Sequence, residues 1–150
     1  MPRPRNKTGN PSGESGESDA RLSPGTENYL LCLYKLWEDD EIPTITQLTD
    51  NLKQLPETEG LGTSVPSVAG MIRCMQRQDL VDVGSDKRIR LTGQGLAGGE
   101  DIARRHRLAE WLVVKLLGMA LHQAYNEAHQ LEHGMSQNFQ EKLVERLGYP

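Results

Sequence analysis

The sequence lacks the features that define secreted and membrane proteins. Only two of its 150 residues are cysteines, Cys32 and Cys74, so disulfides cannot form the framework of a small secreted domain. No apolar run approaches the roughly 18 residues that a membrane helix requires, and the first residues carry no apolar core of a secretory signal. We therefore expect a cytoplasmic protein with no membrane partner.

The composition is that of one soluble domain, or of two small subdomains that share a core. Hydrophobic residues make up 36% of the chain and charged residues 25%, with a formal net charge of −4. Residues 1–22 differ from the rest, because Gly, Ser, Pro and charged residues dominate them. Such a segment cannot offset its own ordering entropy, and we interpret it as a disordered, solvated arm.

Apolar spacing after residue 22 predicts a helical chain with one short hairpin. Ser23-Pro24 is typical of a helix start, and Pro43 ends that helix. Residues 81–83 and 89–91 alternate around a Gly84 turn, which predicts two short strands. The other predicted helices cover residues 44–55, about 66–79, 92–117, 121–134 and 136–147. Three helices followed by a hairpin are the pattern of a winged helix-turn-helix.

This order divides the chain into a winged helix-turn-helix DNA-binding domain over residues 23–92 and a helical domain over residues 93–150. The predicted fold class is therefore mostly α. The helices of the second domain carry apolar faces that are too large for a monomer of this size to cover, so we expect a homodimer. The residues expected to form the dimer core are Trp111, Val114, Leu117, Leu121, Leu131, Leu143 and Leu147.

The second domain also holds the densest group of metal-ligating residues. His129, Glu132 and His133 are spaced i, i+3 and i+4, so on a helix they project from one face. Upstream, His106 and Glu110 form another i, i+4 pair. Two imidazoles and a carboxylate suit a first-row divalent metal, and two helices with such faces can close around one or two ions. The spacing favours a metal-binding domain over a set of merely solvated side chains.

Basic residues are concentrated in one segment of an acidic chain. Residues 63–95 carry five basic and three acidic side chains, whereas residues 23–62 carry two basic and eight acidic ones. An acidic protein can bind DNA when its positive charge lies on one face, and the alternative is a charged but inert surface. We expect contacts to double-stranded DNA from Ser64, Pro66, Ser67, Gly70, Arg73, Arg77, Lys87 and Arg88.

Residues 23–150 resemble the diphtheria toxin repressor family, which includes iron- and manganese-dependent transcription regulators. The more specific stretches are RHRLAE at residues 105–110 and the ExxxxEH pattern at residues 127–133. The other matching stretches are residues 26–30, 66–68 and 88–92. The resemblance implies a homodimer of winged helices joined by a metal-binding dimerisation domain. It also implies that metal orders the first helix and sets the spacing of the two recognition helices.

The resemblance further implies a set of metal ligands. His106 and Glu110 correspond to ligands of one site, and Glu132 and His133 to ligands of another. His129 stands where iron-type members have Cys and manganese-type members have Glu.

The ligand positions depart from the family at several points. Asn28 stands where the two types have Met and Asp, Leu31 replaces a carboxylate of the manganese type, and Tyr125 replaces a ligand His of the iron type. The resemblance thus implies that Asn28 is a sixth ligand. A shell of His, Glu and amide oxygen indicates Mn(II) or Fe(II) as the cofactor, with manganese favoured over iron, and with Zn, Co or Cd also binding in vitro.

We therefore expect a metal-dependent DNA-binding regulator that is not an enzyme. It would be a repressor of metal-uptake genes that binds a palindromic operator as a homodimer. One alternative is a winged-helix regulator or helical interaction module that does not sense metal. Another is an inverted zinc peptidase, because residues 129–133 fit H-x-x-E-H. That class needs a further carboxylate ligand well downstream, for which residues 134–150 leave no room.

Overall fold

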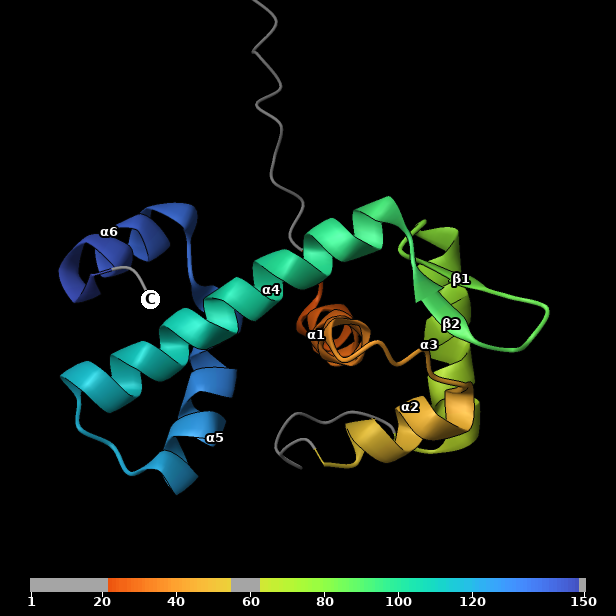
Figure 1. The fold of residues 1–150 in the computed structure, drawn as a ribbon, viewed down its shortest axis with the longest axis horizontal. Coiled ribbons are helices and arrows are strands. Elements are labelled where there is room, and N and C mark those ends of the chain that lie inside the picture. Colours follow the sequence, from red (N-terminus) through yellow and green to blue (C-terminus); the bar gives the residue numbers. More distant parts are fainter. Residues whose placement is uncertain (1–21, 55–62, 149–150) are drawn as a thin grey trace, which may run out of the picture.

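The computed structural model describes residues 22–54 and 63–148 (Figure 1). Residues 1–21 of the predicted arm over residues 1–22, and much of the long loop before the third helix, lie outside the described residues, whereas Leu22 is described and packs against the core. The first half contains α1 (Pro24–Glu38), α2 (Ile45–Leu52), α3 (Val65–Arg77), β1 (Val81–Val83) and β2 (Ile89–Leu91). The second half contains α4 (Gly93–Trp111), a π-helical turn η2 (Leu112–Leu116), α5 (Leu121–Leu131), a 3-10 turn η3 (Glu132–Gly134) and α6 (Gln137–Leu147). The predicted fold class, a winged helix-turn-helix followed by a helical domain, is confirmed.

Side-chain caps set where most of these helices begin. A hydroxyl accepts a hydrogen bond from the backbone N–H three residues later, which satisfies one of the donors that a helix start leaves open. At α2 the cap is reciprocal, because the Gln47 side chain also accepts from the Thr44 backbone. The capping residues are Ser23, Thr44, Ser64, Thr92 and Ser136.

The hairpin is antiparallel and short. Val81 pairs with Leu91 and Val83 with Ile89, so the apolar side chains alternate as the sequence predicts. Asp86 in the turn accepts hydrogen bonds from the Arg90 guanidinium, which holds the pKa of this carboxyl far below its ordinary value. Lys87 adopts a φ of 65°, the left-handed conformation of a tight turn.

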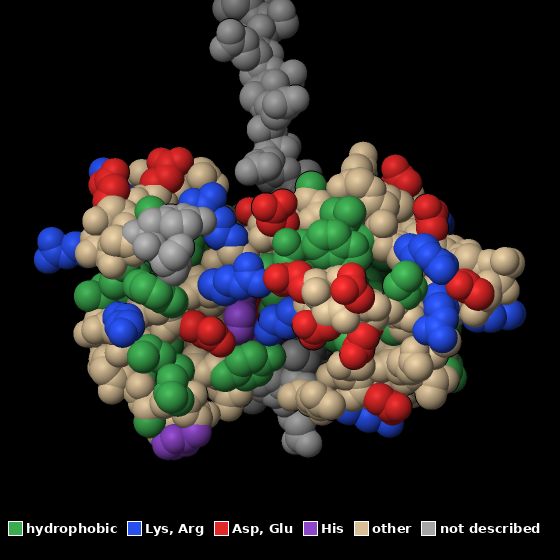
Figure 2. Space-filling view, in the orientation of Figure 1, with side chains coloured by type: hydrophobic (Ala, Val, Ile, Leu, Met, Phe, Trp, Pro, Cys, Tyr) green, Lys and Arg blue, Asp and Glu red, His purple; other side chains and the backbone are tan. Residues whose placement is uncertain are grey.

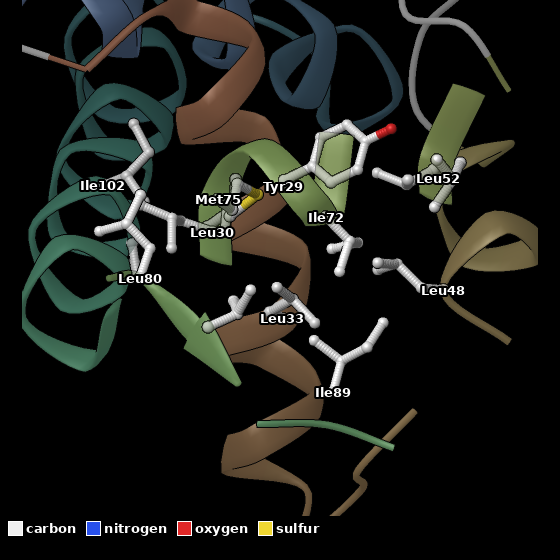
Figure 3. Packing of buried hydrophobic residues seen from close by; sticks show 14 residues of the cluster. Tyr29, Leu30, Leu33, Leu48, Leu52, Ile72, Met75, Leu80, Ile89 and Ile102 are labelled. Carbon is white, nitrogen blue, oxygen red and sulfur yellow. The ribbon is translucent and has the colours of Figure 1, made fainter. Parts of the chain in front are cut away.

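An apolar core joins the winged half to the first part of α4. Figure 3 shows its side chains packed around α1. The fully buried members include Leu30, Leu48, Ile72, Ile89 and Ile102, which come from α1, α2, α3, β2 and α4 respectively. Helix α4 therefore belongs to the core of both halves, although the predicted domain boundary falls at its first residue.

Close approach of α4 to the winged half depends on a glycine. A Cβ built on Gly95 would lie 1.9 Å from the backbone oxygen of Leu80, so only glycine fits there. In this orientation α4 runs along the molecule from the hairpin to α5 and α6 (Figure 1). Because it packs against both α1 and α5, it is the element that connects the two halves.

The second half has a smaller core and a more apolar surface. Leu108, Ala128, Met135 and Leu143 are buried together where α4, α5 and α6 meet. Several large side chains of this half are exposed in the single chain, namely Leu116, Leu117, Leu121, Leu131 and Phe139. Of the expected dimer-core residues, Leu117, Leu121 and Leu131 are thus available to a partner, whereas Leu143 is used within the chain. Among the described residues, no helix is long and apolar enough to cross a membrane.

Candidate metal centre

A cluster of buried imidazoles and carboxylates lies where α4, α5 and η3 meet the start of α1. His106 comes from α4, His129 from α5 and Glu132 from η3, and none of the three is more than 3% exposed. One nitrogen or oxygen from each lies within 4.8 Å of those from the other two. Two histidines and one carboxylate are a donor set that proteins use for divalent transition metals.

Glu132 is the centre of this cluster. One carboxylate oxygen contacts His106 Nδ1. The other, Oε1, lies 2.8 Å from His129 Nδ1 and 3.6 Å from His133 Nε2. Three imidazoles from three different elements therefore surround a single buried carboxylate.

Two further carboxylates hold the outer nitrogens of these imidazoles. Glu110 Oε1 lies 2.9 Å from His106 Nε2, one helical turn along α4. Glu27 Oε1, on the first turn of α1, lies 3.3 Å from His133 Nδ1. Outer carboxylates of this kind fix the tautomer and the ring orientation of metal-binding histidines.

Arg105 completes the cluster on the side of α1. Its guanidinium is 3% exposed and contacts Glu27 Oε2, while Nη1 donates to the backbone oxygen of Glu132 at 3.0 Å. A third partner, Asp101, lies 2.9 Å away and is 55% exposed. A buried cation requires such partners, and here they tie α1 to η3 through α4.

The buried carboxyls are held in their charged forms. Burial alone raises the pKa of Glu27, but hydrogen bonds from His133 and Arg105 outweigh it and lower that pKa below its ordinary value. Burial likewise raises the pKa of Glu132, and hydrogen bonds from His106 and His129 lower it overall. Both groups therefore present carboxylates, which are the form that ligates a metal.

Tyr125 closes one side of the cluster. Its ring is stacked on His129, with centroids 5.8 Å apart and planes at 10°, and meets His106 edge-on at 5.2 Å. The Lys35 ammonium of α1 lies over the Tyr125 ring, 5.4 Å from its centroid. The ring limits the rotation of two imidazoles and shields them from water.

The cluster gathers most of the predicted ligands. Those that meet in it are His106, His129, Glu132 and His133. Glu110 lies at the rim with a side chain 39% exposed, and Asn28 is buried next to Glu27 on α1. The resemblance divides His106 from Glu132 between two sites, whereas here the two side chains are in direct contact. Their roles as ligands remain predictions.

Sequence reasoning missed Glu27 and Arg105. Both lie inside stretches that carry the family resemblance, residues 26–30 and 105–110, but a single charged side chain is usually exposed to solvent. The available signal was Glu27 on the otherwise apolar face of α1. Such a charge is buried only when another element supplies a partner, and that partner is 78 residues away.

The predicted DNA-binding residues lie together on α3 and the hairpin. Ser64 caps α3, and Arg73 and Arg77 are exposed along it. Lys87 is exposed in the hairpin turn. The Arg88 guanidinium instead donates to the backbone oxygen of Ile42, which connects the hairpin to the segment between α1 and α2. On the face that Figure 2 shows, Lys and Arg side chains lie over this end of the molecule with acidic side chains among them, and others lie over the second half.

A winged helix joined by one long helix to a smaller domain with a buried His and Glu cluster defines a class of metal-binding, DNA-binding proteins. Residues 92–150 match the family described as "Iron dependent repressor, metal binding and dimerisation domain". The diphtheria toxin repressor of Corynebacterium efficiens is 34% identical over 122 residues, which cover 81% of this chain and 49% of that protein. The chain belongs to this iron-dependent repressor family.

Solved structures agree with this assignment. The manganese regulator SloR is 29% identical with a TM-score of 0.71, covering 86% of this chain and 56% of that one. ScaR with bound Zn2+ is 32% identical with a TM-score of 0.65, covering 83% of this chain and 54% of that one. The chain spans about half the length of the curated relatives that it matches.

Proposed function

We propose that this chain is a homodimeric, metal-dependent, DNA-binding transcription regulator. The observation that carries the proposal is the buried cluster, because it connects α1 of the winged half to α4 and η3 of the second half. A divalent ion bound there would fix the winged half against the dimerisation half. In a symmetric dimer, this sets the distance and angle between the two α3 helices.

The residues suited to hold the ion are His106, His129, Glu132 and His133. The bound ion would supply the positive charge that offsets the clustered carboxylates. Glu110 and Glu27 orient two of the imidazoles, and Arg105 keeps Glu27 against η3. Occupancy of the cluster is thus linked to the position of α1, which is a central helix of the winged core.

The DNA partner is a duplex with two half-sites. A two-fold dimer presents two copies of α3 and the hairpin, so its operator would be palindromic. Arg73, Arg77 and Lys87 would contact phosphates, while Ser64, Pro66, Ser67 and Gly70 bring the start of α3 close to the groove. The names of the relatives point to Mn(II) or Fe(II) as the cofactor and to repression. We propose metal-uptake genes as the repressed targets.

An enzymatic role is not part of this proposal. In an inverted zinc peptidase Glu132 would be a general base facing water, but both of its carboxylate oxygens already contact imidazoles. The matched relatives are named as repressors and regulators. A cytoplasmic location follows from binding to DNA.

The decisive experiment is a DNA-binding titration with Mn(II), with Fe(II) under anaerobic conditions, and with a chelator. Both metals should tighten binding, and His133→Ala should remove that effect while the helix content stays unchanged. Light scattering with a chelator should still show a dimer, because its interface is apolar. Unchanged DNA affinity in every condition would refute metal dependence, and a monomer at low concentration would refute the dimer.

A further inference from the structure

Nitrogen donors outnumber carboxylates at the centre of the cluster. Glu132 contacts His106 and His129 and lies 3.6 Å from His133, while Glu110 and Glu27 sit outside, each against the outer nitrogen of an imidazole. We infer that the centre holds one ion through two or three imidazoles and Glu132. We further infer that it prefers a borderline ion, such as Fe(II), Co(II) or Zn(II), to Mn(II). This inference rests on the proposed function for its biological use, but not for its test.

The preference follows from ligand chemistry. Imidazole suits iron, cobalt, nickel and zinc, whereas Mn(II) is better served by carboxylate, carbonyl and water oxygens. Two histidines and one carboxylate with open positions are a known donor set for ferrous iron. His129 is the residue that decides the balance, because it is fully buried, contacts Glu132 at 2.8 Å and would be an oxygen donor if it were Glu.

The charge of the cluster fits one ion rather than two. Glu27, Glu110 and Glu132 contribute three negative charges and Arg105 one positive charge, so one divalent ion gives neutrality. Asp101 adds little, because it is 55% exposed and screened by water. A second buried dication would leave an uncompensated charge of +2, which is costly in a low-dielectric interior.

The geometry of the ligands also disfavours a second ion. One oxygen of Glu132 contacts His106 and the other lies 2.8 Å from His129, so both are directed at imidazoles of the one cluster. Glu27 is already paired with the buried guanidinium of Arg105, which repels a second cation from that side. Leu31, one turn further along α1 from Glu27 and Asn28, is 1% exposed and offers no ligand atom.

The test is direct metal binding to the whole chain, without DNA. Isothermal titration gives the stoichiometry and affinity for Mn(II) and Co(II), and visible absorption of Co(II) reports its nitrogen ligands. Any protein site tends to bind Co(II) more tightly than Mn(II), so the informative quantity is how the Co(II)/Mn(II) affinity ratio changes with His129. The two variants are His129→Glu and, as control, His122→Ala, which removes an exposed histidine from the same helix.

We expect one ion per chain in the wild type. His129→Glu should lower the Co(II)/Mn(II) ratio by at least about tenfold, the lower end of what even outer partners of metal sites are worth. It should also change the Co(II) spectrum, whereas His122→Ala should change neither. If His129→Glu does not fold, as judged by circular dichroism, His106→Gln replaces it and should weaken Co(II) binding more than Mn(II) binding.

Two Mn(II) ions per chain, or a ratio that does not change in the folded variant, would overturn the inference. Metal-stimulated DNA binding, measured on the same samples, separates this result from the proposed function. Stimulation together with two bound Mn(II) ions would refute the single nitrogen-rich centre and leave the regulator intact. One tightly bound Co(II) without any effect on DNA binding would support the single nitrogen-rich centre and refute the metal-dependent regulator.

Discussion

Helix α4 contacts α1 in two places of opposite character, which we call the apolar joint and the charged joint. Its first part packs into the apolar core, where Leu30 of α1 and Ile102 of α4 are fully buried. One turn later the same two helices are joined by charges, through Glu27 and Arg105. The apolar joint gains free energy from burial alone, whereas buried charges break even only when each is paired. We therefore expect the first joint to hold the fold and the second to respond to metal.

The largest effect should come from Glu132, the centre of the charged joint. Glu132→Gln removes the charge shared by three imidazoles, so we expect metal binding and metal-stimulated DNA binding to be abolished. The dimer and the helix content should remain, since the apolar cores are untouched. Titration calorimetry measures the metal affinity, and circular dichroism measures the helix content. Glu127→Gln, an exposed change on α5, the helix just before Glu132, is the control. A wild-type metal affinity in Glu132→Gln would show that the cluster is not the metal site.

The apolar joint should show the opposite response. Ile102→Ala should lower the free energy of unfolding by about 2–5 kcal/mol, through lost burial and the cavity left behind. Metal affinity of the folded fraction should change little, because Ile102 belongs to the apolar core and offers no ligand atom. Urea unfolding with a chelator gives the first quantity. Val65→Ala, which alters a side chain that is 46% exposed and lies outside the expected dimer core, should cost no more than about 0.5 kcal/mol. Equal losses in the two variants would show that this core does not hold the winged half.

A third test compares two ion pairs that join the same helices. Glu27–Arg105 is buried, whereas Glu38–Arg107 is exposed with N–O distances of 2.8 and 3.0 Å. Glu27→Gln should weaken metal affinity by about 10–100-fold, the usual cost of losing an outer partner of a metal-binding histidine. Glu38→Gln should change it little, since exposed pairs are worth about 0–1 kcal/mol. Equal affinities in the two variants would contradict a role for Glu27 in orienting His133.

The pH dependence of stability should follow from Glu27. Its pKa is lower in the folded chain than its ordinary value of 4.5, so it binds fewer protons when folded. Its contribution is therefore complete above about pH 4.5 and is lost as the pH falls through the folded pKa. Urea unfolding of the metal-free protein between neutral and acid pH should show a shallower loss in Glu27→Gln than in the wild type. If the free energy of unfolding falls equally with pH in the two proteins, Glu27 makes no such contribution to stability.

The two joints also differ in how far the sequence predicts them. Apolar spacing is repeated over many residues, so it indicates the helices, the hairpin and the winged arrangement. The i, i+4 spacing likewise places His129 with His133, and His106 with Glu110, because the two members of each pair are one helical turn apart in the chain. Local spacing cannot show which pairs meet. The contact of His106 with Glu132 depends on how α5 packs against α4 across 26 residues.

Single charges are the hardest to predict. Arg105 and Arg107 are neighbours on α4, yet one is buried against Glu27 and the other is exposed against Glu38. Nothing in the identity of an arginine distinguishes these positions, and only the tertiary packing of α1 does. The π-helical turn at residues 112–116 was also missed, because Leu112, Val113 and Val114 continue an ordinary helical pattern.

The smallest effect should come from a surface that belongs to neither joint. Arg73 is exposed on α3, so Arg73→Ala should leave stability and metal affinity unchanged. If its guanidinium contacts a phosphate, the variant should bind every DNA sequence more weakly, and the slope of log K against log salt should fall by about 1. Arg146→Ala, which removes an exposed arginine from α6, should leave the slope unchanged, because that helix lies in the other half. The comparison requires DNA titrations at several salt concentrations with metal held in excess, so that both variants are fully loaded. A slope that falls equally in both would show only a general effect of net charge, whereas a slope unchanged in Arg73→Ala would move the DNA-binding surface away from α3.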